Sequence, residues 1–190
     1  MATAEHALNT RWALWEHEDA SNRKRRASYA SLMRCMHTFG TVEEFWCLYN
    51  NYPRPHDFMS DAGFIKRIQR KEQTFALEAI SVFREGILPE WEDSANASGG
   101  EVRVKVSAAA PAVVDEVWEM LLLTTIGETL PEADCDVTGL RVVDKGRGTC
   151  RFEVWTSTKP TEGLVAKVRR ACEESGLEGF KIQIVEHGKS

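Results

Sequence analysis

The chain has 190 residues, a hydrophobic content of 43% and a formal net charge of −5 at pH 7. This length supports one compact domain with its own core and is too short to expect two. The acidic balance excludes a general nucleic-acid coat protein, because such proteins bind through an excess of Lys and Arg.

Cysteine usage and the N-terminus indicate the compartment. The five cysteines are odd in number, widely spread and without CxxC or Cys/His spacing, so neither a disulfide framework nor a zinc site is expected. No basic region followed by an apolar one opens the chain, and no run approaches membrane-spanning length. We therefore expect a soluble cytoplasmic protein, with the nucleus as a second compartment, that has no metal, no cofactor and no membrane partner.

The N-terminal part predicts two strands and a helix. Residues 10–18 alternate with period 2, with tryptophan on both faces, and residues 28–39 form a weaker strand candidate. Thr41 and Glu44 form a capping box, in which hydroxyl and carboxylate satisfy the unpaired N–H groups of a helix start. The apolar face of this helix is formed at i, i+3, i+4 and i+7 by Val42, Phe45, Trp46 and Tyr49.

The middle of the chain combines an excursion, two strands and an unusual loop. Residues 51–73 carry two prolines and the basic run "KRIQRK", which predicts a long excursion with a short basic helix in its middle. Residues 74–84 and 101–108 are strand candidates, the second with valines on one face and charges on the other. Between them, Trp91 is followed by two acids and then by small residues, so it lies on no apolar face.

The C-terminal part predicts two helices and three strands. One helix begins at Pro111 and ends before Gly127, and another begins at Pro160 and ends before Gly176. The strands are residues 139–144 and 149–155, which form a hairpin, and residues 180–187. Strands of alternating polarity separated by three helices indicate an α+β fold, with one antiparallel sheet and helices on one face.

Catalytic motifs are weak in this sequence. No HExxH pair, GxSxG motif or P-loop spacing occurs. Glu92 and Asp93 are able in principle to hold a divalent metal, although two adjacent acids are common on protein surfaces. We expect no enzyme, with a nucleotide hydrolase that uses these two acids as an alternative, and we interpret Asp93 as holding the turn.

Five segments, in the same order, carry a resemblance to a known family. The chain resembles the eukaryotic mRNA cap-binding translation initiation factors of the 4E type from His6 to about Val185. The resemblance implies a single cap-binding domain over residues 1–190, with an inserted segment at about 54–73 whose basic run contacts nucleotides or a partner. It also implies a curved sheet of about eight strands, three main helices on the convex face and a cap site on the concave side. The segments are "HALNTRWALWEHE", "FGTVEEFWCLYN", "FREGILPEWEDSANASGGEV", "VWEMLLLTTIGE" and "FEVWTS".

The resemblance implies a site for the 7-methylguanosine cap. Family members hold the base between two aromatic rings, because N7-methylation leaves it with a delocalised positive charge. Trp91 matches one ring, and Tyr29 falls where the family has its other stacking tryptophan. Glu92 matches the acid that accepts from the guanine edge, and Trp155 the tryptophan against the N7-methyl group. The positions that hold the triphosphate bridge are matched by Lys145, Arg147 and Arg151.

The resemblance also implies a scaffold-binding surface on the back of the molecule. Val42 and Trp46 match residues on which scaffold proteins of the 4G type, or 4E-binding proteins, place a helix. His6, Leu123 and Ile126 border that surface. A buried core ring is the alternative for Trp46, because apolar helix stripes usually face inward.

The implied function is recruitment of capped mRNA to the translation initiation machinery through a scaffold protein. The alternative is a cap-binding translational repressor or a specialised paralogue with weak or altered scaffold binding. Tyr29 and the inserted segment depart from the family pattern, and they favour a divergent member that reads a modified, for example hypermethylated, cap.

Overall fold

One antiparallel sheet organises the molecule. The computed structural model describes residues 5–19, 32–58, 67–70, 73–107, 110–131, 133–146 and 148–188. The strands are β1 (Ala7–Glu18), β2 (Met33–Thr41), β3 (Arg67–Arg70), β4 (Gln73–Arg84), β5 (Gly100–Ser107), β6 (Val137–Asp144), β7 (Thr149–Thr156) and β8 (Lys181–Glu186). They form an eight-stranded sheet in the order β2-β1-β4-β6-β7-β5-β8, and β3 pairs with β4 beside this path.

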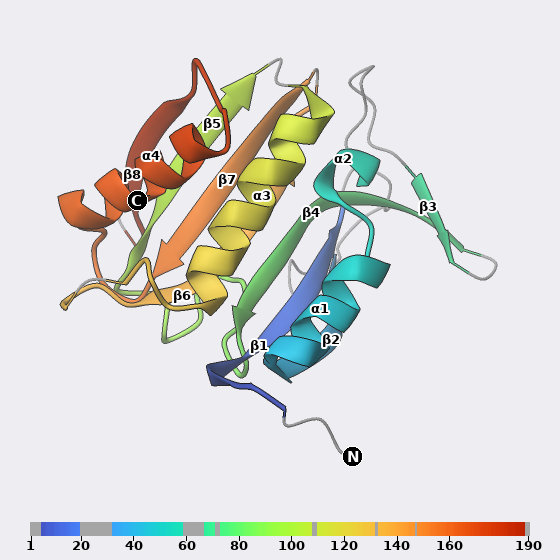
Figure 1. Cartoon of the computed structure of the whole chain (residues 1–190), viewed down its shortest axis with the longest axis horizontal. Coiled ribbons are helices and arrows are strands. Elements are labelled where there is room, and N and C mark those ends of the chain that lie inside the picture. Colours follow the sequence, from blue (N-terminus) through green and yellow to red (C-terminus); the bar gives the residue numbers. More distant parts are fainter. Residues whose placement is uncertain are drawn as a thin grey trace.

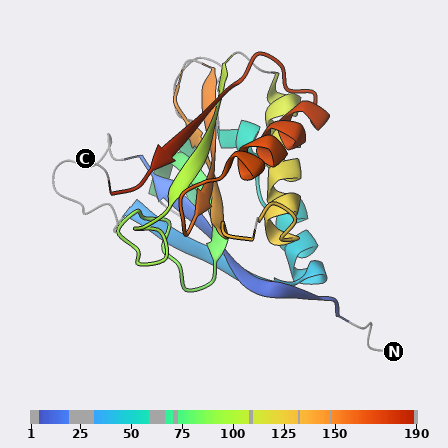
Figure 2. The same cartoon turned by 90° about the vertical axis from the view of Figure 1, so that its left-hand side faces the viewer.

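Three main helices cover one face of this sheet. The helices of the described residues are α1 (Val42–Asn51), α2 (Pro55–Phe58), α3 (Pro111–Ile126) and α4 (Glu162–Glu174). Figure 1 shows α1, α3 and α4 in front of the sheet, and the side view in Figure 2 places all three on the same side of it. The predicted fold class is therefore confirmed, and the opposite side of the sheet is called the helix-free face below.

The start of α1 confirms the predicted capping box. The hydroxyl of Thr41 accepts a hydrogen bond of 3.1 Å from the N–H of Glu44. The carboxylate of Glu44 accepts one of 2.7 Å from the N–H of Gly40, one residue before the cap. Both groups thus satisfy N–H donors at the helix start, and the turn from β2 into α1 is sharply defined.

The basic run after α2 was predicted to be a helix, and this prediction is wrong for its described part. Residues Arg67–Arg70 form β3, which pairs in antiparallel register with residues 73–76 of β4. Strand formation depends on a neighbouring strand that offers hydrogen-bond partners, and local residue preference does not report that neighbour.

Alternation along β5 separates the core from the helix-free face. Val102, Val104 and Val106 are buried in the core beneath the helices, together with Trp118 and Leu121 of α3. Because successive side chains of a strand point to opposite faces, the intervening charged residues of β5 lie on the helix-free face. Within the described ranges, no helix is long and apolar enough to cross a membrane.

Candidate functional site

A tightly bonded loop of residues 88–99 carries the predicted Trp91–Glu92 pair. The carboxylate of Asp93 accepts hydrogen bonds of 2.9 Å from the backbone N–H groups of Leu88 and Ala95. Both of its oxygens are therefore used inside the loop. The interpretation of Asp93 as the residue that holds the turn agrees with this geometry.

Asn96 fastens the same loop to the sheet. Its side chain is fully buried, and its amide nitrogen donates to the carbonyl groups of Leu88 and Glu90, both at 2.9 Å. Its amide oxygen accepts a hydrogen bond of 2.8 Å from the hydroxyl of Thr138 in β6. A stretch of small residues that reads as a loose linker is thus a rigid loop, and sequence reasoning missed the buried amide.

Trp91 projects from this rigid loop into solvent. Its side chain is 52% exposed, and Glu92 beside it is also exposed. Both residues border a groove of about 510 Å³ between the loop and the helix-free face. Four of the predicted site residues therefore meet at one groove: Trp91, Glu92, Arg151 and Trp155.

Trp155 forms part of the groove floor. It is only 5% exposed, and its ring packs edge-on against Phe83 with centroids 5.4 Å apart. The ring of His187 lies 4.6 Å away on another side. Trp155 thus offers a limited surface to a ligand, in contrast to the largely free ring of Trp91.

The groove floor also contains a buried acid that sequence reasoning missed. Glu153 is 1% exposed, and its carboxylate accepts from Arg151 Nε at 2.6 Å and from Trp155 Nε1 at 3.1 Å. Arg141 adds an ion pair at 3.9 Å. Burial alone would raise the pKa of Glu153, but the charges of Arg141 and Arg151 outweigh it and lower the pKa below its usual value.

A second buried acid, Glu101, lies beside the first. It is 2% exposed, and its Oε1 accepts from Arg103 Nε at 2.6 Å, whereas Oε2 has no hydrogen-bond partner within the described ranges. Burial, followed by the negative charge of Glu153, raises the pKa of Glu101 to about 7. The groove floor therefore holds three guanidinium groups and two carboxylates, and one carboxylate is close to protonation at neutral pH. The alternation of "EVRVKV" showed the charged face of β5, but it could not show which side chains of the neighbouring strands lie beside that face.

Of the remaining predicted cap-site residues, the structure describes only Lys145. Lys145 lies in the turn after β6, outside the groove walls. Its side chain is exposed, but partial desolvation, together with the charge of Arg151, lowers its pKa. Tyr29 and Arg147 lie outside the residues that the structure describes.

The predicted scaffold-binding residues lie on the helix side of the molecule. The apolar face of α1 divides: Phe45 and Tyr49 are buried, whereas Val42 and Trp46 are each 37% exposed. The alternative of a buried ring for Trp46 therefore does not hold. Its indole is supported from beneath by edge-on contacts with Phe45 and Tyr49 at 5.0 and 5.6 Å.

The other predicted residues of this surface differ in how far their side chains are exposed to solvent. His6 is exposed, and its N–H and ring Nδ1 bond to the carboxylate of Glu43 at 3.0 and 2.7 Å. These hydrogen bonds lower the pKa of Glu43 to about 2. Leu123 is half-buried, whereas Ile126 is buried and presents little side-chain surface at its predicted border position.

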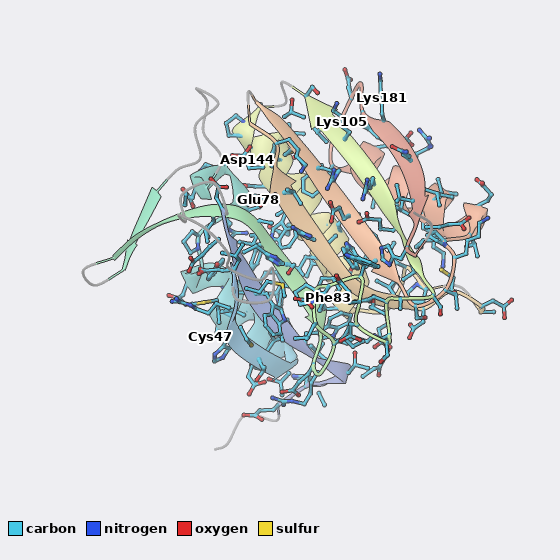
Figure 3. The ribbon with its side chains drawn as sticks, turned by 180° about the vertical axis from the view of Figure 1, so that it is seen from behind. Cys47, Glu78, Phe83, Lys105, Asp144 and Lys181 are labelled. Atoms are coloured by element: carbon cyan, nitrogen blue, oxygen red, sulfur yellow. The ribbon has the colours of Figure 1, made fainter. Side chains whose placement is uncertain are left out.

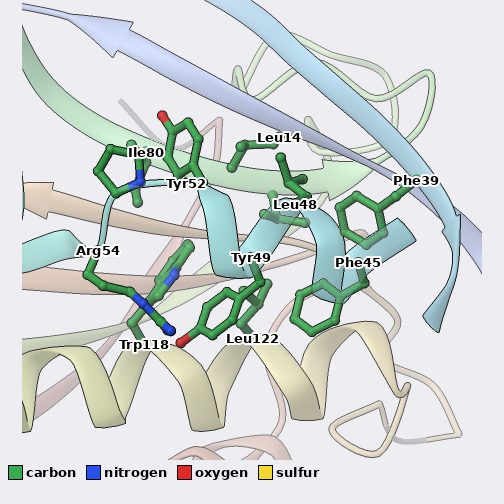
Figure 4. A pocket seen from close by; sticks show the side chains of 12 residues that line it. Leu14, Phe39, Phe45, Leu48, Tyr49, Tyr52, Arg54, Ile80, Trp118 and Leu122 are labelled. Atoms are coloured by element: carbon green, nitrogen blue, oxygen red, sulfur yellow. The ribbon is translucent and has the colours of Figure 1, made fainter. Parts of the chain in front are cut away.

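A polar cluster joins α1, α3 and the first residue of the predicted insertion. The hydroxyl of Tyr49 donates to Glu119 at 2.7 Å, and Arg54 lies over the Tyr49 ring and 3.5 Å from the same carboxylate. Figure 4 shows Tyr49, Arg54 and Trp118 around a small apolar cavity of about 20 Å³. A cavity of this size holds about one water molecule, so we assign no ligand to it.

Comparisons with known proteins agree with one another. A family model described as "Eukaryotic initiation factor 4E" matches residues 7–186. The chain is 35% identical to a "Eukaryotic translation initiation factor 4E" of Candida glabrata, covering 92% of this chain and 77% of the relative. The corresponding protein of Saccharomyces cerevisiae is 34% identical, with 92% and 76% covered.

Solved structures share the fold at lower sequence identity. The structure described as "Complex of C. elegans eIF4E-3 with the 4E-binding protein Mextli" matches with a TM-score of 0.71 and 22% identity, covering 97% of this chain and 94% of that one. "Crystal structure of Schistosome eIF4E complexed with m7GpppG and 4E-BP" matches with a TM-score of 0.70 and 22% identity, covering 96% and 90%.

Proposed function

The chain belongs to the eukaryotic initiation factor 4E family, and from this premise we propose that it binds the 7-methylguanosine 5′ cap of mRNA and recruits the mRNA for translation through a scaffold protein. One observation carries the proposal: an exposed tryptophan and an adjacent carboxylate stand on a rigid loop at the mouth of a charged groove. We infer from this role that the protein acts in the cytoplasm.

Trp91 and Glu92 form one wall of the proposed cap site. An exposed indole face stacks on a cationic base and gains roughly 1–3 kcal/mol. Glu92 then offers two acceptor oxygens to the two N–H donors on the guanine edge. Because Asn96 and Asp93 hold the loop, little ordering of Trp91 and Glu92 is needed on binding.

The opposite wall of the site rests on Tyr29. We assign it the second stacking position from the family resemblance, since it lies outside the described residues. Trp155, on the groove floor, contributes the contact with the methyl group at the edge of the base. A tyrosine ring attracts a cation less strongly than indole, so a weaker interaction on this side is expected.

Arg151, Lys145 and Arg147 are the proposed phosphate-binding residues. In the free protein the guanidinium of Arg151 is held by the buried carboxylate of Glu153. A bound triphosphate therefore shares Arg151 with Glu153. Three arginines and five glutamates line the whole groove, so the phosphates depend on the guanidinium of Arg151 itself and not on an overall positive charge. Protonation of Glu101 lessens the negative charge of the groove floor.

Scaffold recruitment is assigned to the surface of Val42 and Trp46, where an exposed indole offers apolar area and one N–H donor. A repressor or specialised paralogue with altered scaffold binding remains the second candidate. It is favoured because the carboxylate of Glu119, on α3 next to α1, already bonds to Tyr49 and Arg54 and is therefore less available to a partner helix. Pull-down of a scaffold fragment by the wild type and by Trp46→Ala separates the two: the first candidate requires binding that the substitution removes.

The test of cap binding is a titration of tryptophan fluorescence with m7GTP and with GTP. Tighter binding of m7GTP is expected, because the charge created by methylation is what stacked rings recognise. Trp91→Ala and Tyr29→Ala should each weaken m7GTP binding, and equal affinity for the two nucleotides would contradict the proposal.

A hydrolase that uses Glu92 and Asp93 has no support from the loop geometry, because both Asp93 oxygens bond to backbone N–H groups. We propose a binding protein without a catalytic step. Recovery of unchanged m7GTP after long incubation with magnesium is the expected result.

A further inference from the structure

Three rows of side chains cross the helix-free face of β7, β5 and β8. Strand register places one residue from each strand in each row, and consecutive rows are two residues apart, roughly 7 Å along the strands. The first row contains the groove tryptophan, and the last contains no acid. In order, the rows are Trp155–Glu101–Val185, Glu153–Arg103–Gln183 and Arg151–Lys105–Lys181.

The third row is positively charged along its whole length. Lys105 and Lys181 are both exposed and are direct cross-strand partners. In Figure 3, which looks onto the helix-free face, they lie near one end of the strands, while Phe83, the neighbour of Trp155, lies toward the other. Like charges directly opposite each other destabilise a sheet, so this pair is not explained by fold stability.

The two lysines differ from the arginines of the groove in their partners. Arg103 is bonded to Glu101, and Arg151 is bonded to Glu153. Across the described part of the chain, no carboxylate forms an ion pair with Lys105 or Lys181. Their ammonium groups are therefore available to an external anion.

We propose that Lys105 and Lys181 bind the phosphodiester backbone of the nucleotides that follow the cap. The proposal rests on the cap-binding function proposed above, and it extends that site along the sheet. Arg151 belongs both to the groove floor and to the third row, so it joins the two regions without a gap. A ligand with its base at Trp91 and Trp155 and its phosphates at Arg151 continues toward the two lysines.

An RNA backbone fits this row better than a protein partner. The exposed large apolar residues of the described ranges are Val42, Trp46, Leu88 and Trp91, and none of them lies in the third row. Protein interfaces depend on buried aromatic or aliphatic anchors, which this row lacks. Sequence-independent phosphate contact requires only exposed cations along the path of the strand.

The experiment compares m7GTP with an m7G-capped oligoribonucleotide of about eight nucleotides, enough to pass the third row at one phosphate per nucleotide. Dissociation constants are measured for the wild type and for Lys105→Ala/Lys181→Ala. Lys105→Arg/Lys181→Arg retains both charges and serves as one control. Arg169→Ala/Arg170→Ala removes two exposed charges from α4, on the other side of the sheet, and is the matched control for net charge.

The wild type should bind the capped oligonucleotide more tightly than m7GTP. Lys105→Ala/Lys181→Ala should remove most of this advantage, which corresponds to a loss of about three- to tenfold in oligonucleotide affinity at low salt. The slope of log K against log salt concentration should become shallower by about 1.4, or about 0.7 for each phosphate that the variant no longer neutralises. The variant's affinity for m7GTP should fall by a smaller factor than its affinity for the oligonucleotide, because only the phosphate nearest Arg151 approaches Lys105, whereas the oligonucleotide continues over both lysines. Both control variants should behave like the wild type.

Two results would overturn the inference while leaving cap binding intact. One is a wild type that binds the capped oligonucleotide no more tightly than m7GTP. The other is a double-alanine variant that keeps the full advantage of the oligonucleotide. Failure of the proposed cap-binding function is separate, because it shows as equal affinity of the wild type for m7GTP and GTP.

Discussion

The indole N–H of Trp155 donates a hydrogen bond of 3.1 Å to the carboxylate of Glu153 on the floor of the groove. The same carboxylate holds Arg151 and pairs with Arg141. One buried acid therefore orients a tryptophan and two arginines at once. The proposed base-contacting and phosphate-binding parts of the site are coupled through this residue.

Replacement Glu153→Gln should destabilise the protein by about 3 kcal/mol in urea-induced unfolding, because it leaves the buried guanidinium of Arg141 and the half-buried one of Arg151 without their counter-charge. The matched control is Glu174→Gln, which removes an exposed i, i+4 pair with Arg170 and should cost less than about 0.5 kcal/mol. Equal effects of the two substitutions would show that the buried network contributes no more than a surface pair.

Glu101 should make stability depend on pH in an unusual direction. Its pKa is raised in the folded state to about 7, so the folded protein binds more protons than the unfolded chain between its ordinary value, about 4.5, and 7. The Glu101 contribution to stability is therefore largest below pH 4.5 and is lost as pH rises toward 7.

The measurement for Glu101 is the difference in free energy of unfolding between the wild type and Glu101→Gln. From pH 5 to pH 7.5 the wild type should lose, relative to Glu101→Gln, on the order of 2 kcal/mol of unfolding free energy. Since glutamine does not titrate, contributions from other groups cancel between the two proteins. A difference that stays flat with pH would contradict the raised pKa.

Asn96→Ala should loosen the loop that carries Trp91. It removes two hydrogen bonds to backbone carbonyl groups and one from Thr138, all at a fully buried position. We expect a loss of about 2–3 kcal/mol in unfolding free energy, and weaker m7GTP binding at a temperature where the variant is folded. Ser98→Ala, at an exposed position of the same loop, is the control and should change neither quantity.

Trp46→Ala should separate the two proposed binding surfaces. The indole is partly exposed on the helix side, whereas the groove lies on the helix-free face, so m7GTP affinity should be unchanged. Binding of a helical peptide from a scaffold protein should fall at least tenfold, as is typical of a central aromatic contact. Leu88→Ala, which removes an exposed apolar side chain away from α1, should leave peptide binding intact.

Most local elements and their order could be predicted from the residue pattern, with β3 as the exception. The capping box of Thr41 and Glu44 marks the start of α1, and the alternating valines of β5 show which face enters the core. These features could be predicted because capping and periodicity act over a few neighbouring residues. The Trp91–Glu92 pair was also visible, since it stands outside any apolar pattern.

Which of these residues are buried, paired or exposed depends on the packing of distant segments. Phe45 and Trp46 are neighbours on one helix, yet the first is buried and the second stands at the surface. The acids Glu101 and Glu153 come from strands about 50 residues apart, and their closeness to each other, like the ion pair of Glu153 with Arg141, exists only after β5, β6 and β7 align. Burial and charge pairing depend on what distant segments bring close, and local sequence patterns do not contain that information.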